Sequence, residues 1–211
     1  MRDVCVLLHG IEADPSLLLW NEEVAVRYQH LTPIQLVPRK YGYQSGWTVW
    51  FSALARREVV DHEEQYFRGI PGQLFGLLEL IKPGAKVHVV GHSLGGYIIT
   101  ALLKRGVKFG NVAHLWGSTV ADFDWHKVDD NFAKARVYWS PDDEVLRASS
   151  IAVDEDPELA LGLMGKIGPQ IAHPRVESIK EPFGFKLHNQ FMDDTPERDL
   201  FWADLLGWLG N

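Results

Sequence analysis

The fold is decided by one stretch of the sequence, Val87-His88-Val89-Val90-Gly91-His92-Ser93-Leu94-Gly95-Gly96-Tyr97-Ile98-Ile99. A run of mostly β-branched residues predicts a buried strand over 87–90, and apolar residues at helical spacing predict a helix over 94–104. Between them lies Gly-x-Ser-x-Gly, which in this context is typical of a tight strand-to-helix turn that exposes the serine hydroxyl. We therefore expect Ser93 to have a strained backbone and a helix N-terminus directly behind it.

The same alternation of elements continues along the rest of the chain. Further short apolar runs closed by Gly, Pro or Ser predict strands over 4–8, 34–37, 112–116, 136–139 and 176–179. Helical spacing occurs over 17–27, over 45–81 with an interruption at Pro71-Gly72, and over 196–209. Strands alternating with helices predict an α/β fold: a three-layer α/β/α arrangement around a mostly parallel sheet of about six strands.

Length and composition set the class of protein. A chain of 211 residues with 46% hydrophobic and 23% charged residues is expected to form one globular domain over 1–211. The net charge of −7 argues against nucleic acid as a partner. The single cysteine, Cys5, excludes an internal disulfide, and no apolar stretch approaches a membrane span. We expect a cytoplasmic protein without integral membrane association, and the sequence leaves its oligomeric state open.

The turn sequence Gly91-His92-Ser93-Leu94-Gly95-Gly96 resembles that of the α/β-hydrolase superfamily, in particular its small esterases and lipases without a lid. The resemblance covers nearly the whole chain and implies that Ser93 is a nucleophile, followed in the chain by an acid and then a histidine. A serine hydroxyl needs a base to remove its proton, and a third group must orient that base. The segment 122–134 is too short for a folded cap domain, so the resemblance implies a minimal fold with an open site.

The acid and the base implied by this order both have candidates in the sequence. Three carboxylates follow the strand over 136–139, and Asp143 in Ser140-x-x-Asp143-x-Val145-Leu146 resembles the acid of several minimal members, with Asp142 as the alternative. His188 follows the last predicted strand and precedes the final helix, where the histidine of the family falls. His173 precedes that strand and is therefore expected on the opposite side of the sheet.

The resemblance also implies an oxyanion hole made of two backbone N–H groups. The first is that of Leu94, after the nucleophile, and the second is assigned to Ile11, because His9-Gly10-Ile11 resembles the His-Gly dipeptide found there in the family. We expect Trp116 and Trp139 to line the acyl side of a substrate pocket, which would favour apolar acyl groups. No spacing typical of metal ligands occurs, and we expect neither a metal nor a cofactor.

These residues together predict a serine carboxylesterase that acts on a small-molecule ester, with a short to medium acyl chain, through an acyl-enzyme. The alternatives are a lipase or a thioesterase with the same three catalytic residues, because such residues select acyl transfer and not the leaving group. A hydrolase-fold protein that only binds a ligand is the alternative from another class. The natural substrate is left open, as is whether the segment over 45–70 forms a flap over the site.

Overall fold

The computed structural model describes residues 3–10, 19–40, 52–69, 84–149 and 161–211. Its centre is a six-stranded sheet in the order β2-β1-β3-β4-β5-β6, in which every neighbouring pair is parallel. The strands are β1 (Val4–Leu8), β2 (Gln35–Arg39), β3 (Val87–His92), β4 (Asn111–Leu115), β5 (Lys134–Trp139) and β6 (Val176–Lys180). The predicted α/β fold with a mostly parallel sheet of about six strands is confirmed.

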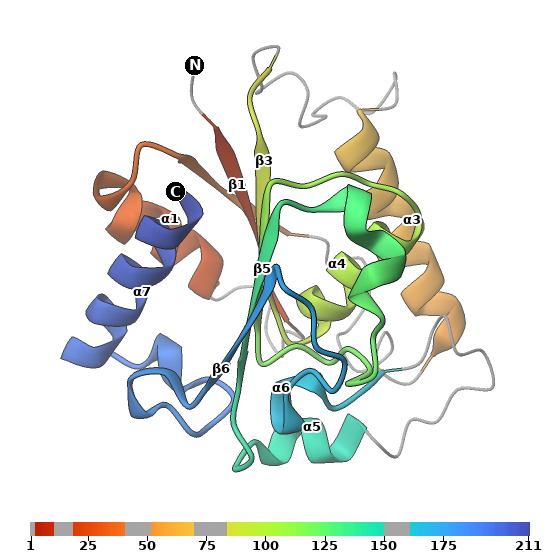
Figure 1. Ribbon diagram of the computed structural model, residues 1–211. Helices are drawn as coiled ribbons and strands as arrows, with labels where there is room; N and C mark the ends of the chain where they lie inside the picture. Colours follow the sequence, from red (N-terminus) through yellow and green to blue (C-terminus); the bar gives the residue numbers. More distant parts are fainter. Residues whose placement is uncertain (1–2, 11–18, 41–51, 70–83, 150–160) are drawn as a thin grey trace.

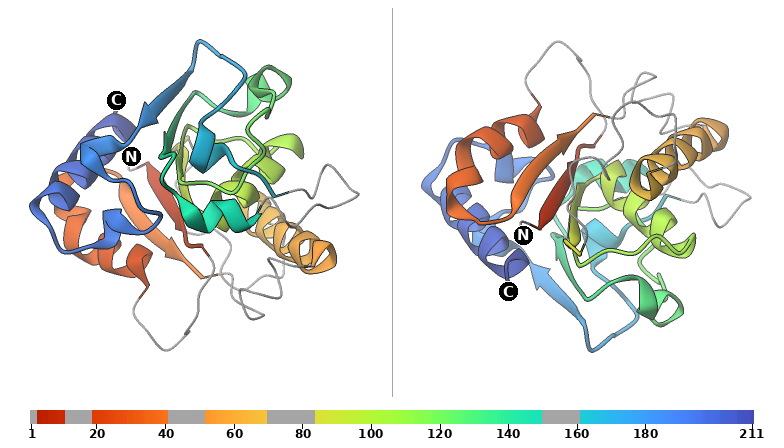
Figure 2. Two further views of the ribbon diagram at one scale, coloured as in Figure 1. Left: turned by 90° about the horizontal axis from the view of Figure 1, so that it is seen from below. Right: turned by 90° about the horizontal axis from the view of Figure 1, so that it is seen from above.

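Helices cover both faces of this sheet and form the two outer layers (Figures 1 and 2). One face carries α1 (Trp20–Tyr28) and α7 (Pro196–Leu209), and the other carries α3 (Ala53–Arg68) and α4 (Leu94–Lys104). The shorter helices are α5 (Glu144–Ser149), α6 (Met164–Ile167) and the 3-10 helices η1 (Gln29–Leu31), η3 (Trp125–Asn131), η4 (Pro182–Gly184) and η5 (Gln190–Met192). The part of the chain that the structure describes contains no separate cap domain.

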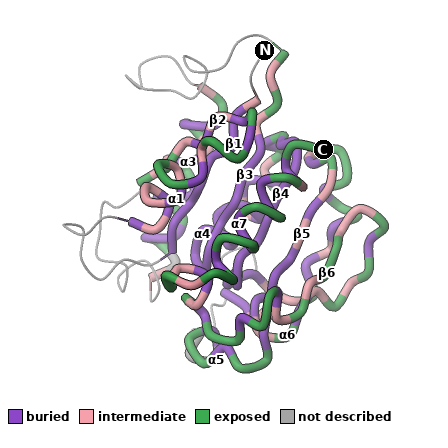
Figure 3. The backbone as a smooth tube through the Cα atoms, turned by 90° about the vertical axis from the view of Figure 1, so that its left-hand side faces the viewer, coloured by how far each residue is buried: buried purple, intermediate pink, exposed green. Residues whose placement is uncertain are grey.

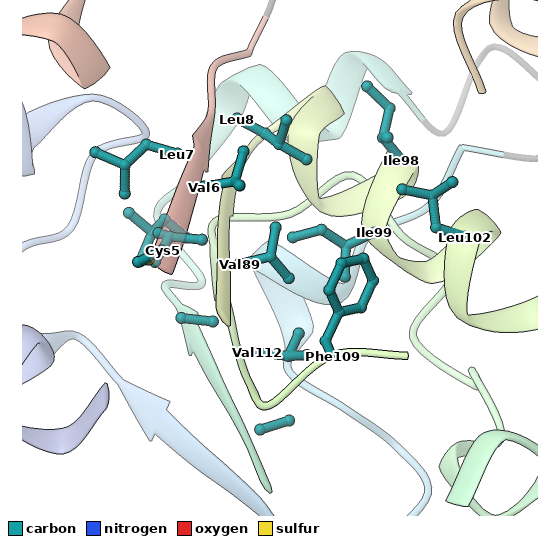
Figure 4. Close-up of a cluster of buried hydrophobic side chains, with 14 of the residues drawn as sticks. Cys5, Val6, Leu7, Leu8, Val89, Ile98, Ile99, Leu102, Phe109 and Val112 are labelled. Carbon is teal, nitrogen blue, oxygen red and sulfur yellow. The ribbon is translucent and has the colours of Figure 1, made fainter. Parts of the chain in front are cut away.

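The central strands are apolar on both sides because they lie between two helical layers. All five residues of β1 are buried, and Figure 3 shows the buried strands passing beneath the exposed outer side of α7. In Figure 4, Val6 and Leu8 lie on the side of Ile98 on α4, while Cys5 and Leu7 point to the opposite face. Burial also raises the pKa of the Cys5 thiol, so this residue is a small apolar core residue.

Aromatic rings join α1 and α7 on their side of the sheet. Trp20 stacks on Trp202 with ring centroids 5.8 Å apart and an interplanar angle of 22°, and Tyr28 also stacks on Trp202, at 6.1 Å. The hydroxyl of Tyr28 donates a hydrogen bond to Asp199 over 2.5 Å. Helix α7 begins after Thr195, whose hydroxyl accepts the Arg198 N–H, as expected for an N-cap followed by proline.

The observed strand boundaries differ from the predictions by up to two residues, since β3 ends at His92 and β5 begins at Lys134. Strand β2 runs two residues beyond the predicted 34–37 and includes Pro38, which an edge strand tolerates because one side of its backbone is unpaired. The predicted helical region over 45–81 contains α3, whereas residues 45–51 and 70–81 lie outside the described residues. These include both ends of the segment 45–70, for which the sequence left a flap open. No described helix has the length and apolar character needed to cross a membrane.

Candidate active site

The C-terminal ends of all six strands lie on the same side of the sheet, so the segments that follow β1, β3, β5 and β6 are expected to meet there. Ser93 follows β3 directly and has φ 53° and ψ −117°, a sparsely populated conformation for a residue with a side chain. A Cβ on Gly91 would lie 2.6 Å from the carbonyl carbon of Gly95, and one on Gly95 would lie 2.7 Å from the Leu8 carbonyl oxygen. The turn therefore requires glycine at both positions.

Backbone hydrogen bonds hold the Ser93 turn against the end of β4 and the residues that follow it. The Ser93 N–H donates to the Leu115 carbonyl over 3.0 Å, and the Ser93 carbonyl accepts the N–H groups of Gly96 and Ser118. Serine at the N-cap of a helix usually accepts a backbone N–H with its side chain, but the Ser93 hydroxyl makes no such capping bond to α4. This hydroxyl is therefore not committed to holding the helix.

The acid and histidine candidates are brought together. His188 Nδ1 lies 2.7 Å from Asp143 Oδ2, and the two side chains are 6% and 0% exposed. The other carboxylate oxygen of Asp143 accepts the Leu146 N–H in the first turn of α5. Because a carboxylate accepts, Nδ1 of His188 carries the proton of the neutral ring, and Nε2 is left with a free lone pair. The ring can accept a proton at Nε2.

The structure separates the residues that the sequence offered as alternatives. Asp142 is exposed and pairs with Lys186, with 3.9 Å between Asp142 Oδ2 and Lys186 Nζ. His173 lies before β6 and contacts Asp129, with 2.9 Å between Nε2 and Oδ1. Of the two aspartates, Asp143 is therefore the one in contact with a buried histidine.

His92, the residue that precedes Ser93, contacts His188 and so places His188 near Ser93. The His92 ring centroid lies 4.6 Å from that of His188, and His92 Nε2 lies 3.1 Å from the His188 backbone oxygen. The described hydrogen bonds do not include one between the Ser93 hydroxyl and the His188 ring. Such contacts are often longer than a hydrogen bond before substrate binds. The geometry therefore joins the candidate base to the candidate acid and places His188 beside the residue that precedes Ser93.

Of the two N–H groups expected in an oxyanion hole, one can be located. Leu94 is the first residue of α4, where a backbone N–H has no acceptor within the helix. Ile11 lies outside the described residues. Gly10, which precedes it, packs against Ser93, since a Cβ added to Gly10 would lie 2.9 Å from Ser93 Cβ. Gly10 therefore lies directly beside Ser93.

The two tryptophans expected in a pocket have different surroundings. Trp116 follows β4 with φ 46°, is 0% exposed, and stacks on Phe191 with an interplanar angle of 6°. Phe191 in turn contacts His92, with centroids 5.0 Å apart. Trp139 ends β5 near the edge of the sheet, where its indole N–H donates to the Ser178 hydroxyl over 3.0 Å. Trp116 is thus connected to the residues around Ser93, and Trp139 packs beside β6.

Burial lowers the pKa of two histidines, His9 and His92, near the C-terminal ends of the strands. His9 lies after β1, and desolvation lowers its pKa to about 4 despite its hydrogen bond to the Gly10 carbonyl. Burial, followed by the charge of His188, holds the pKa of His92 well below its usual range. Both rings are therefore neutral near pH 7, and they add no positive charge beside His188. Within the described ranges, no group of three His, Cys, Asp or Glu side chains is arranged to hold a metal ion.

Sequence reasoning missed a lysine that holds the acid loop, which we define as residues 140–143 with the candidate acid Asp143. Lys166 lies on the short helix α6, and its ammonium donates to the carbonyl oxygens of Pro141, over 2.7 Å, and Asp143, over 2.9 Å. The Ser140 N–H donates to Gly165 of the same helix. No pattern in the sequence indicates these contacts, because α6 and the acid loop are distant in the chain. Lys166 thus fixes the backbone on both sides of Asp142.

We expect Lys166→Met to lower kcat about tenfold, since losing two hydrogen bonds to the acid loop would loosen Asp143 by about 1 to 2 kcal/mol. Lys166→Arg should retain more activity, because the guanidinium can still donate. Steady-state hydrolysis of a p-nitrophenyl ester measures the effect. Lys127→Met is the matched control, since the Lys127 side chain is 80% exposed and pairs only with Asp124 among the described residues. Equal kcat in Lys166→Met and the control would show that the acid loop needs no such anchor.

Comparisons with known proteins place this geometry in a family. A protein-family profile described as the alpha/beta hydrolase family matches residues 5–210. No curated protein matches the sequence. Among solved structures, TT1662 from Thermus thermophilus is similar with a TM-score of 0.56 at 13% identity, over 100% of this chain and 90% of that one.

Two further structures have titles that print an activity. Carboxyl esterase 2 from the mycorrhizal fungus Tuber melanosporum has a TM-score of 0.52 at 10% identity, over 99% of this chain and 78% of the esterase. Acyl-protein thioesterase 2 from Zea mays has a TM-score of 0.51 at 11% identity, over 100% of this chain and 94% of the thioesterase. At such identities the likeness shows a shared fold, and the family match covers nearly the whole chain. The protein therefore belongs to the alpha/beta hydrolase family.

Proposed function

We propose that this protein is a serine carboxylesterase that hydrolyses carboxylic esters of short to medium acyl chain through Ser93, His188 and Asp143. The observation that carries the proposal is the 2.7 Å contact between buried His188 and Asp143, beside a serine at the strained turn before α4. A buried carboxylate on Nδ1 fixes the tautomer in which Nε2 can act as a base. A small-molecule ester is the proposed substrate, and the reaction needs no cofactor.

The reaction follows from these roles. The Ser93 hydroxyl oxygen bonds to the ester carbonyl carbon while its proton passes to His188 Nε2, and the N–H groups of Leu94 and Ile11 donate to the resulting oxyanion. The carbon–oxygen bond to the alcohol then breaks, and the imidazolium returns the proton to the leaving alkoxide. Water attacks the acyl-enzyme with His188 again accepting a proton. The bond between the acyl carbon and the Ser93 oxygen then breaks while the imidazolium gives its proton to that oxygen, so the acid is released and the Ser93 hydroxyl is restored.

The acyl side of the pocket is part of the proposal. We assign it to Trp116 and Trp139, as expected from the sequence. Trp116 has the stronger support because its stack on Phe191 leads to His92 and the nucleophile turn. An apolar lining of this kind favours uncharged acyl groups. The catalytic residues alone do not distinguish an oxygen ester from a thioester, so a thioesterase and a lipase are the alternative outcomes of a substrate panel.

Covalent labelling tests the proposal directly. We expect a fluorophosphonate to add one phosphonyl group per chain, with the adduct on the tryptic peptide that contains Ser93 and none after heat denaturation. In parallel, p-nitrophenyl esters of increasing chain length, acyl thioesters and triglycerides are compared by kcat/KM. Preference for short and medium p-nitrophenyl esters supports the carboxylesterase, and preference for another class reassigns the substrate. A folded protein without label would overturn the enzyme and favour a protein that only binds a ligand.

A further inference from the structure

His92 occupies the first x position of Gly-x-Ser-x-Gly, directly before Ser93. It lies between Ser93 and the loop after β6 that carries His188. It is the last residue of β3, is 4% exposed, and has no role in the proposed reaction. Its ring is enclosed by His188, by Phe191 with centroids 5.0 Å apart, and by Trp20 at 6.1 Å. A side chain in this position can fix where His188 lies relative to the end of β3.

One polar contact links the His92 ring to the loop that carries His188. His92 Nε2 lies 3.1 Å from the His188 backbone oxygen. A carbonyl oxygen only accepts, so His92 Nε2 must be the donor and its Nδ1 carries no proton in the neutral ring. The contact joins residues 96 positions apart in the chain. It therefore connects the end of a central strand to a segment outside the sheet.

The charge state of His92 suits a neighbour that becomes cationic. Burial, and then the charge of His188, keep the pKa of His92 well below its usual range, with a smaller contribution of the same sign from His9. The ring is therefore neutral when His188 accepts a proton. A protonated His92 at a centroid distance of 4.6 Å would repel that imidazolium. A neutral donor can hold the loop without opposing proton transfer.

The loop around His188 needs an anchor of this kind. Strand β6 ends at Lys180, and the next residues form the single turn η4 before the loop reaches His188. The Gln190 side chain accepts the N–H groups of Lys186 and Leu187, but these bonds stay within the loop. The contact of Asp143 fixes the His188 ring, whereas the contact of His92 fixes its backbone.

We infer that His92 is a positioning residue, whose Nε2–H holds the His188 backbone so that the His188 ring faces the Ser93 hydroxyl. This inference rests on the proposed function. Strand β3 is hydrogen-bonded to β1 and β4 on its two sides, so its last residue is a rigid reference point. Because His92 and Ser93 are consecutive residues, one backbone segment determines the positions of both the Ser93 hydroxyl and the His188 ring.

Two substitutions of His92 by side chains of similar length distinguish the hydrogen bond that His92 donates from its packing contacts. Glutamine in His92→Gln can present an amide N–H near the position of Nε2, and methionine in His92→Met cannot donate. We expect His92→Met to lower kcat about 30- to 100-fold with KM within about twofold, since a misplaced catalytic group costs about this much. His92→Gln should retain kcat within about fivefold of the wild type. If methionine prevents folding, His92→Phe serves as the second variant without a donor.

A double-mutant cycle identifies the residue through which His92 acts. In a His188→Ala background, His92→Met should leave the residual rate unchanged within about twofold, because the anchored base is already absent. The matched control is His88→Met, which replaces the buried histidine near the start of β3 and should keep kcat. Tm values for all variants show that each one is folded.

Three results would overturn the inference while the wild type remains active and labelled at Ser93. These are wild-type kcat in His92→Met, an equal loss in His92→Gln, or a further loss in the His188→Ala background. The last result would mean that His92 acts through the nucleophile turn itself. A wild type with neither activity nor label would overturn the proposed function, and this inference with it. The two failures are therefore distinguishable.

Discussion

Ser93→Ala should lower kcat for p-nitrophenyl esters by about 10⁵-fold and abolish covalent labelling, because the replaced hydroxyl is the proposed attacking group. The residual rate would come from substrate binding and the oxyanion N–H groups alone. The Ser93 hydroxyl does not cap α4, so its removal costs the helix no hydrogen bond. The variant should therefore fold with a Tm near that of the wild type.

The control for Ser93→Ala is Ser118→Ala. The Ser118 hydroxyl is buried and has no hydrogen-bond partner among the residues that the structure describes, although its backbone N–H donates to the Ser93 carbonyl. Its removal should leave kcat within about threefold and should not lower stability, since an unpaired buried hydroxyl is itself unfavourable. Substantial ester hydrolysis by purified Ser93→Ala would mean that a different nucleophile is at work.

Ser93→Gly separates activity from strain at the same position. Alanine retains the Cβ that makes φ 53° unfavourable, whereas glycine adopts this conformation freely. Both variants should be inactive, and the glycine variant should have a free energy of unfolding about 1 kcal/mol higher than the alanine variant. Urea unfolding followed by circular dichroism measures the difference.

Asp143→Asn should lower kcat by about 10⁴-fold, because an amide in place of the carboxylate favours the wrong tautomer of His188 and cannot stabilise the imidazolium. The carboxylate is fully buried against His188 Nδ1 at 2.7 Å, so no water can take its place at that nitrogen. The expected loss falls in kcat, since the change acts on proton transfer.

Asp142→Asn is the matched variant, one residue earlier in the chain and with the same chemical change. Its side chain is exposed and lies 3.9 Å from Lys186, so kcat should stay within about twofold. Steady-state kinetics of the two variants in parallel measure the ratio. A larger loss in Asp142→Asn than in Asp143→Asn would reverse the assignment of the acid.

Much of the fold could be predicted because its signals are local. The boundaries of β1, α4 and α7 follow from a continuous apolar run, from the glycine turn and from apolar residues at helical spacing over 196–209. The end of β2 was missed, since Pro38 and Arg39 look unlike strand residues until the strand is known to lie at an edge. The alternation of strands and helices was enough to predict the parallel sheet.

The site was less predictable, because its contacts join distant parts of the chain. The order of the three candidates could be read from the sequence, but two adjacent aspartates have the same local chemistry. Only the turn before α5 buries Asp143 and exposes Asp142. The contacts of His92 and Lys166 with backbone carbonyls have no sequence signature, since any residue supplies such an acceptor.

The stacked indoles of Trp20 and Trp202 give the molecule an internal optical label. Two parallel rings at 5.8 Å couple their electronic transitions, so the near-ultraviolet circular dichroism band depends on how α1 is docked on α7. Trp20 also contacts the His92 ring edge to face. His92 in turn lies against His188, so we expect the emission of Trp20 to respond to a ligand bound beside the proposed base.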